Sequence, residues 1–261
     1  MANFLTSSIG KKFIQSVSGA FLIIFLLLHG TINFFSVIDT FQGTYGKVAV
    51  DETLFSTGDG LFKLGCDFMS TMVIDIMVPI LALGFVIHIV YGIYLSIENY
   101  KKRGGFKRYE VASKAKADSW SAKNMFVLGI IILGFIGFHL THFWAEMQMK
   151  DFFGDGGEEN PYLLLNTTFS SWWMLALYIV WFFFIWLHLN HGFWSMFHTI
   201  GWNNDKWFKR LKVIGIIVST LIVLLFVTVA VNAFIQANWP CAETAANLEA
   251  YAAAIHAIPA L

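Results

Sequence analysis

Five long stretches of this 261-residue chain are almost free of charged side chains. A helix that crosses a lipid bilayer needs about 20 consecutive, mostly apolar residues, and each stretch meets that length. Their approximate bounds are 13–38, 71–97, 124–145, 171–197 and 213–237. Because lipid offers no water to bond with the backbone, each stretch is expected to be an α-helix. The sequence therefore predicts an all-α integral membrane protein, with five transmembrane helices in residues 1–237 and a tail over 238–261.

The composition agrees with a chain that lies in lipid. Charged residues make up 13% of it, whereas soluble domains carry about 25%. The 17 basic and 17 acidic residues cancel, so the net charge gives no reason to expect a nucleic acid partner. The two cysteines, Cys66 and Cys241, form no CxxC motif, which excludes an iron–sulfur centre or a disulfide framework as the organising principle. Whether these two pair in a disulfide stays open.

Basic residues are distributed unevenly between the two ends of the predicted helices. Loops on the cytoplasmic side of a membrane carry an excess of Lys and Arg. Fourteen of the 17 basic residues lie at the start of the first helix, after the second or after the fourth: Lys11, Lys12, Lys101, Lys102, Arg103, Lys107, Arg108, Lys114, Lys116, Lys123, Lys206, Lys209, Arg210 and Lys212. Only Lys47, Lys63 and Lys150 lie on the other side. The sequence therefore predicts a cytoplasmic N-terminus and a C-terminus outside.

Each of the first four predicted helices carries a histidine deep in its apolar run: His29, His88, His139 and His188. Polar side chains inside a span are costly and are usually functional. Each histidine lies about 16 residues from the start of its helix, and successive helices run in opposite directions. The first and third helices therefore share one depth, and the second and fourth share another, about 10 Å away. Since two neutral imidazoles can hold a haem iron from both faces, the pattern predicts four helices bundled around two stacked b haems.

Other roles for these histidines stay open at this point. An intramembrane histidine can be a hydrogen-bonded packing residue, a stage of a proton relay or a zinc ligand, although zinc prefers all its ligands around one point. His142 and His191 each lie three residues after a candidate, on nearly the same helix face, and either could replace its neighbour. Glycines such as Gly84, Gly92 and Gly192 flank the candidates. They would let a flat macrocycle or a neighbouring helix approach closely.

Two sequence motifs resemble those of a known family. The run Gln15–Gly19 (QSVSG), with His29 fourteen residues after Gln15, is similar to the opening motif of the five-helix, two-haem cytochrome b subunits of bacterial succinate:menaquinone and fumarate:menaquinol reductases. The run His188–Ser195 (HLNHGFWS), which continues to Gly201 and Trp202, resembles the motif of the fourth helix in that family. The resemblance extends over all five spans, from about residue 11 to 237.

The resemblance implies one haem-ligating histidine on each of the first four helices. The matching positions are His29, His88, His139 and His188. It implies that the histidines of the second and fourth helices hold the haem proximal to an iron–sulfur subunit, and that those of the first and third hold the distal haem. The spacing to neighbouring glycines in the family favours these positions over His142 and His191.

Four further positions bear on cofactor chemistry. Gln15 and Ser16 lie at the inner end of the first helix, where we expect them to hydrogen-bond a propionate of the proximal haem, with helix capping as the alternative. Asp75 is the one acid inside the predicted spans, and it is the candidate proton acceptor of a quinone site, with a helix cap or a headgroup contact as the alternative. Some family members carry protons on a glutamate at the position of Trp186, so no compensating proton path is expected here.

The resemblance thus implies the cytochrome b subunit of a succinate dehydrogenase or quinol:fumarate reductase in the bacterial cytoplasmic (inner) membrane. The chain would hold two haem b groups and a menaquinone. The succinate or fumarate site, FAD and iron–sulfur clusters would belong to a flavoprotein and an iron–sulfur subunit on the cytoplasmic side. A dimer of such heterotrimers stays open, as do the haem potentials and the direction of the reaction. The alternatives are the cytochrome b subunit of a hydrogenase or formate dehydrogenase, and a non-redox transporter or scaffold with proton-relay histidines.

Overall fold

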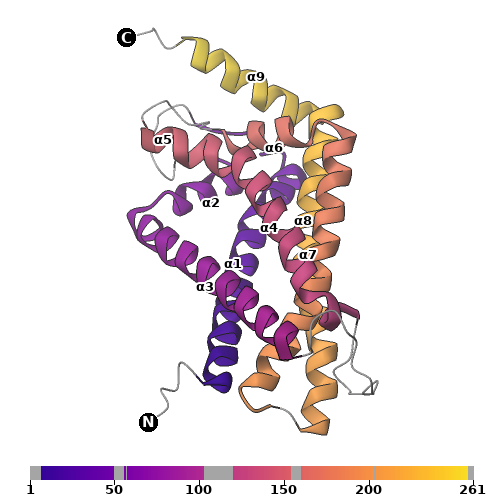
Figure 1. The fold of residues 1–261 in the computed structure, drawn as a ribbon. Coiled ribbons are helices and arrows are strands. Elements are labelled where there is room, and N and C mark those ends of the chain that lie inside the picture. Colours follow the sequence, from indigo (N-terminus) through magenta and orange to yellow (C-terminus); the bar gives the residue numbers. More distant parts are fainter. Residues whose placement is uncertain are drawn as a thin grey trace. The chain divides into compact units, whose positions relative to one another are not determined.

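The computed structural model describes residues 7–49, 56, 58–102, 120–153, 160–202 and 204–257, without the side chains of 73–75, 148, 151, 152 and 255–257. No strand occurs in this part of the chain. The helices, in chain order, are α1 (Ser8–Gln42), α2 (Leu61–Met69), α3 (Met72–Lys102), α4 (Trp120–His142), the π-helical turn η2 (Ala145–Met149), α5 (Lys150–Phe153), α6 (Pro161–Phe169), α7 (Trp172–Thr199), α8 (Asp205–Asn238) and α9 (Ala242–Ala257) (Figure 1).

Five helical segments are long and apolar enough to cross a membrane. They are Ser8–Gln42, Ile76–Lys102, Trp120–Met147, Trp172–Thr199 and Asp205–Asn238. The predicted number and approximate positions of the apolar helices are therefore confirmed. The first and fifth of these helices are longer than predicted. The helix α1 continues past residue 38 to Gln42, and α8 begins at Asp205 instead of residue 213. The predicted tail contains a helix of its own, α9.

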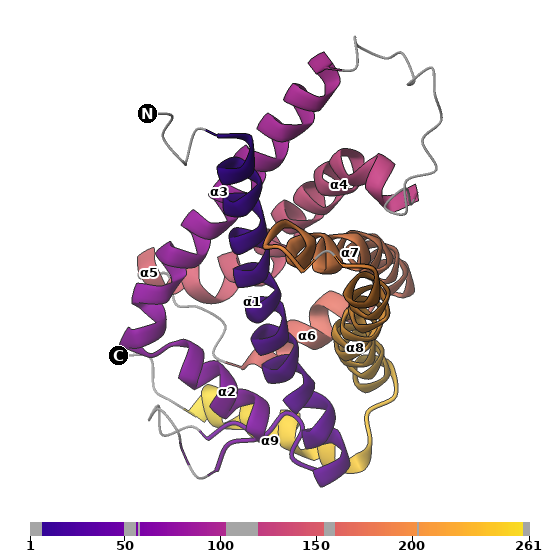
Figure 2. The ribbon, with the colours of Figure 1, turned by 90° about the horizontal axis from the view of Figure 1, so that it is seen from below.

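The chain divides into two compact units. Unit 1 comprises Met1–Leu27, Met77–Gly134 and Phe183–Val223, and unit 2 comprises Leu28–Ile76, Phe135–Phe182 and Leu224–Leu261. Each long helix contributes one segment to each unit. The helices α7 and α8 run side by side (Figure 2). In unit 1 the Trp186 indole on α7 donates a hydrogen bond of 3.0 Å to the Thr220 hydroxyl on α8.

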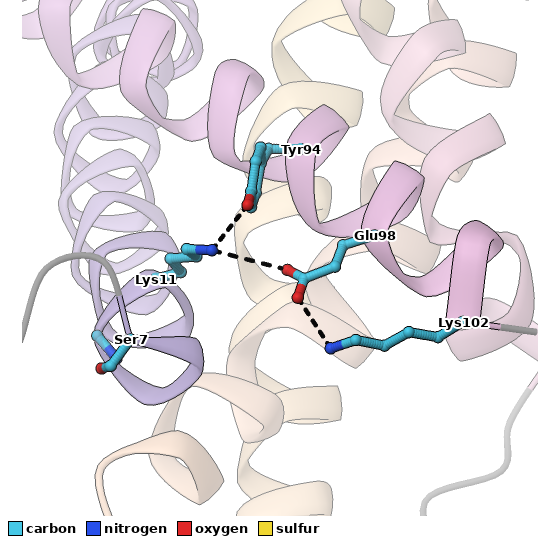
Figure 3. A network of polar contacts seen from close by, with 6 residues as sticks. Ser7, Lys11, Tyr94, Glu98 and Lys102 are labelled. Atoms are coloured by element: carbon cyan, nitrogen blue, oxygen red, sulfur yellow. Dashed lines mark hydrogen bonds and ion pairs between the residues drawn. The ribbon is translucent and has the colours of Figure 1, made fainter. Parts of the chain in front are cut away.

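In unit 1, α3 crosses α1 obliquely (Figure 1), and polar contacts join one end of this α1–α3 seam. The Lys11 ammonium donates a 2.7 Å hydrogen bond to the Tyr94 hydroxyl and lies 4.0 Å from the Glu98 carboxylate. Glu98 also pairs with Lys102 one turn later on α3, at 2.8 Å (Figure 3). A surface ion pair contributes about 0–1 kcal/mol, so these contacts set the register of α1 against α3 more than they add stability.

Glycines allow the same two helices to approach each other further along the seam. A Cβ added at Gly84 would lie 2.8 Å from ring carbons of Phe21, and one added at Gly92 would lie 3.5 Å from the side-chain nitrogen of Gln15. Gly84 therefore serves helix packing, whereas a Cβ at Gly92 would make an ordinary van der Waals contact. Of the two uses open for Gly84 in the sequence, close approach of a helix is the one that the structure supports.

Unit 2 contains a buried carboxylate near the C-terminal end of α1. Asp39 is fully buried and accepts hydrogen bonds from the backbone amides of Leu61 and Phe62, at 2.9 and 2.8 Å, and from the hydroxyls of Thr44 and Tyr162, at 2.8 and 2.6 Å. The two amides open α2, where an acidic side chain is stabilised by the helix dipole. Burial, together with the bond to Asp39, raises the pKa of Tyr162. The expectation that Asp75 is the one acid in a span was wrong, because α1 extends far enough to include Asp39.

Candidate functional site

Two of the four candidate histidines lie together in unit 1. His88 on α3 and His188 on α7 have ring centres 6.2 Å apart, with the ring planes inclined by 66°. The Nδ1 atom of His188 is buried and has no hydrogen-bond partner among the described atoms. Two helices that are far apart in sequence thus bring two imidazoles to one place.

Polar residues of α1 contact the His88 ring. The Ser18 hydroxyl lies 3.2 Å from His88 Nδ1 and 3.1 Å from the backbone carbonyl of Gln15. The Gln15 side-chain nitrogen lies 3.4 Å from both ring nitrogens of His88. With its proton on Nδ1, the imidazole would donate to the Ser18 oxygen and present the Nε2 lone pair to a metal. Gly19 completes the contact, because an added Cβ would lie 3.3 Å from the imidazole.

The other two candidates lie together in unit 2. His29 on α1 and His139 on α4 have ring centres 6.1 Å apart, with the planes inclined by 83°. The side-chain nitrogen of Asn33, one turn after His29, lies 3.5 Å from His29 Nδ1 and donates a 2.8 Å bond to the His29 carbonyl. Phe226 on α8 packs beside His29, with ring centres 5.7 Å apart.

The surroundings of His139 are aromatic. Its ring centre lies 5.0 Å from Phe143, 5.5 Å from Trp181 and 6.2 Å from Tyr178. The Nδ1 atom of His139, the Trp181 indole nitrogen and the Tyr178 hydroxyl are all buried and have no hydrogen-bond partner among the described atoms. An unpaired buried polar group costs about 1–3 kcal/mol, so three of them in one cluster are unusual.

Both pairs fit the geometry of a haem held from two sides. A metal–imidazole bond is about 2.0 Å long and a ring centre lies about 1.2 Å beyond its nitrogen, so two imidazoles that bind one iron from opposite sides have centres about 6.4 Å apart, close to the 6.1 and 6.2 Å observed. Two imidazoles complete the coordination of an iron that already has four porphyrin nitrogens, but they are too few for tetrahedral zinc. Within the described ranges no group of three or more His, Cys, Asp or Glu is placed to hold a metal ion.

The two competing histidines have other contacts. His142 Nδ1 lies 2.9 Å from the backbone carbonyl of Phe138, with the two rings 4.2 Å apart, so this imidazole bonds to its own helix. The His191 ring packs edge-on against Trp194, 4.8 Å away on the same helix. In the structure it is therefore His139 and His188 that face a histidine of another helix.

The other predicted site residues are placed as follows. The Gln15 side-chain nitrogen lies 3.4 Å from both ring nitrogens of His88, so Gln15 contacts the imidazole itself. The buried Ser16 hydroxyl donates to the backbone carbonyl of Lys12 at 2.9 Å. The side chain of Asp75 lies outside the described residues.

The cysteines are separate in the structure. Cys66 and Cys241 are both free thiols. Mainly through burial, the pKa of the Cys66 thiol is raised to about 12. This thiol is therefore protonated and unreactive near neutral pH.

The sequence interpretation missed Ser18, Asn33, Tyr178 and Trp181. Ser18 lies in the quoted QSVSG motif, and the structure places it, rather than Ser16, against a candidate ligand. Asn33 lies one turn after His29, a spacing that indicates contact on a helix face. Tyr178 and Trp181 are hidden in an aromatic run that gives no signal of polar function.

A Cβ at Gly129, Gly134, Gly137 or Gly192 would meet no atom within 4 Å. Gly192 lies one turn after His188, and no described atom lies near the position that its Cβ would take, in contrast to the tightly packed Gly84.

Comparison of the chain with protein-family models, curated proteins and solved structures finds no match.

Proposed function

We propose that this chain is the membrane-spanning, dihaem cytochrome b subunit of a succinate dehydrogenase or quinol:fumarate reductase, reacting with menaquinone. The observation that carries the haem part of the proposal is the presence of two imidazole pairs with ring centres 6.1 and 6.2 Å apart, each inside one compact unit. Each pair is drawn from two different helices, as ligation of one iron from both faces requires. The choice of succinate and fumarate rests on the sequence resemblance.

The residues of the chain would have three roles: they would ligate the haems, orient an imidazole and exclude water. When bound, the haems would supply one-electron carriers between an iron–sulfur subunit and menaquinone. The imidazoles of His88 and His188 would hold one haem iron, and those of His29 and His139 would hold the other. Ser18 orients the first of these rings, and the aromatic rings around His139 keep its surroundings dry. Asp75 is proposed to accept or release a proton at the quinone site.

The decisive experiment is purification of the chain with its natural partners from the cytoplasmic membrane. We expect a reduced-minus-oxidised spectrum typical of b haem, two haems per chain, and a succinate-oxidising flavoprotein in the same complex. A colourless preparation would contradict the haem assignment. Two haems beside a hydrogenase or formate dehydrogenase partner would contradict the choice of enzyme alone.

The position of Trp186 leads to a prediction about the membrane potential. Its indole is bonded to Thr220, and an indole cannot exchange protons as a carboxylate does. Turnover in sealed proteoliposomes is therefore expected to generate a potential, which a voltage-sensitive dye would report. Electroneutral turnover would show that another group replaces the missing proton path.

A further inference from the structure

Two buried donors of unit 2 have no function in haem ligation. Tyr178 and Trp181 lie one turn apart on α7, with 2% and 6% of their surfaces exposed. Their ring centres are 5.6 Å apart, and both rings lie within 6.2 Å of His139. Neither the Tyr178 hydroxyl nor the Trp181 indole nitrogen has a hydrogen-bond partner in the part of the chain that the structure describes.

The chemistry of the cluster specifies the kind of ligand that it would take. The indole N–H is only a donor, and the phenol can donate its proton as well as accept one, so the group that matches both as donors is an oxygen that accepts. The other rings around the two donors are phenylalanines. They are Phe135, Phe138, Phe143, Phe169 and Phe182. Such a setting suits a flat, neutral ring that carries a carbonyl.

A carboxylate fits this position poorly. A charge that is moved into apolar surroundings needs a countercharge, and the bases described in unit 2 are few. Of these, Lys63 is paired with Asp67 and Lys150 with Glu146. The neutral donors thus favour a carbonyl over a haem propionate. A bridging water could also satisfy the indole, because the Tyr178 oxygen accepts as well as donates. Such a water would leave quinone binding unchanged in variants that lack either donor.

We propose that Tyr178 and Trp181 bind the head group of a neutral quinone beside His139, by donating hydrogen bonds to a carbonyl oxygen of the ring. This inference rests on the proposed function and names the site of its quinone. The indole fixes the carbonyl as a pure donor. The phenol adds a second bond, and the surrounding phenylalanines provide faces for the quinone ring.

The test uses the intact complex with its partners and the soluble analogue 2,3-dimethyl-1,4-naphthoquinone. Tyr178→Phe and Trp181→Phe remove the donor and keep a ring in each position. Trp173→Phe is the matched control, because Trp173 lies on the same helix and is 52% exposed. Equilibrium dialysis gives the dissociation constant, and infrared spectroscopy gives the carbonyl stretching frequency of the bound analogue.

Each donor variant should weaken binding about threefold to tenfold, the usual effect of losing one hydrogen bond, and the double variant should weaken it further. The carbonyl band should move to higher frequency, while haem content and haem spectrum stay unchanged. The control should bind as the unaltered complex does. In the unaltered complex the carbonyl stretching frequency of the bound analogue should be lower than in an aprotic solvent, because the hydrogen bonds weaken the C=O bond. This measurement needs no variant.

Three results would overturn the inference. One is unchanged binding and an unchanged carbonyl band in both donor variants. Another is an altered haem spectrum with unchanged quinone binding, which would assign the donors to a haem carboxylate. The third is an unshifted carbonyl band in the unaltered complex. Each of these results can be obtained only with a complex that holds two haems. If the proposed function itself is wrong, the unaltered complex will contain no haem, so the two failures can be told apart.

Discussion

His88 of unit 1 has polar contacts from α1, whereas His139 of unit 2 packs against aromatic rings. Ser18 and Gln15 both lie within 3.4 Å of the His88 ring nitrogens. Around His139 the neighbours are Phe143, Tyr178 and Trp181, and its Nδ1 has no partner among the described atoms. The two pairs nevertheless have nearly the same spacing between ring centres.

This difference shows that ligand spacing and ligand environment are set by different parts of the sequence. The spacing follows from where each histidine lies along its helix. The environment follows from which neighbouring helix face is polar, and it controls the tautomer and basicity of the imidazole. Each pair combines one imidazole that has a polar contact, His88 or His29, with one whose Nδ1 has no partner among the described atoms, His188 or His139. The pairs differ in the source of the polar contact: Ser18 reaches His88 from another helix, whereas Asn33 lies on the same helix as His29.

The largest effect is expected from removing one ligand of each pair. His88→Ala should abolish the haem proposed for unit 1 and His139→Ala the one proposed for unit 2, because an iron with one remaining imidazole is held far more weakly. Each variant should retain about one of two haems, measured by pyridine haemochrome assay on the purified complex. His142→Ala is the control and should retain both, since that ring bonds to its own helix. Loss of both haems in either ligand variant would show that the two pairs are not independent.

A smaller effect is expected from adding a side-chain atom to the tightly packed α1–α3 seam of unit 1. Gly84→Ala places a Cβ 2.8 Å from the Phe21 ring, and overpacking of this kind costs about 1–3 kcal/mol. The thermal midpoint should fall by several degrees, and the haem held by His88 should be lost before the other on heating. Gly129→Ala, where a Cβ meets nothing within 4 Å, should leave stability unchanged or raise it slightly. Equal effects of the two substitutions would argue against the seam.

The five apolar helices could be predicted because lipid imposes a minimum length and excludes charge, and both can be read directly from the residues. The short helices α2 and α6 could not, since they depend on tertiary hydrogen bonds: the Leu61 and Phe62 amides of α2 and the Tyr162 hydroxyl of α6 all donate to Asp39. Asp39 itself lies one residue past the predicted first span. The end of a helix is set by such local partners, which a count of apolar residues does not include.

The histidine pairs were predicted by combining depth with helix direction, and the structure brings both predicted pairs together. The contacts around them were predicted less well. Of the polar residues in the QSVSG motif, Ser16 was chosen for its position near the membrane surface, yet Ser18 has the orientation that reaches His88. Which of two nearby serines faces a neighbouring helix depends on the packing angle, and a single sequence does not contain that angle.

Proton chemistry at the quinone should depend on unit 2 alone. Asp75 lies in the segment of α3 that belongs to unit 2. Asp75→Asn should lower succinate:quinone activity at least tenfold, since a positioned acid or base contributes about 100-fold or more. The haem content and spectrum of both units should not change. Normal activity with a soluble naphthoquinone would remove Asp75 from the site.

The smallest effect, and the sharpest test of the contrast between the units, concerns Ser18. An imidazole whose Nδ1–H is hydrogen-bonded is a stronger electron donor and stabilises the oxidised iron. Ser18→Ala removes that partner, at a cost of about 1 kcal/mol, which corresponds to a rise of roughly 40 mV in a one-electron potential. A redox titration should show this rise in one haem only. Ser16→Ala should shift neither haem, because its hydroxyl bonds to the Lys12 carbonyl; equal shifts in both variants would mean that the polar contact to His88 does not set the potential.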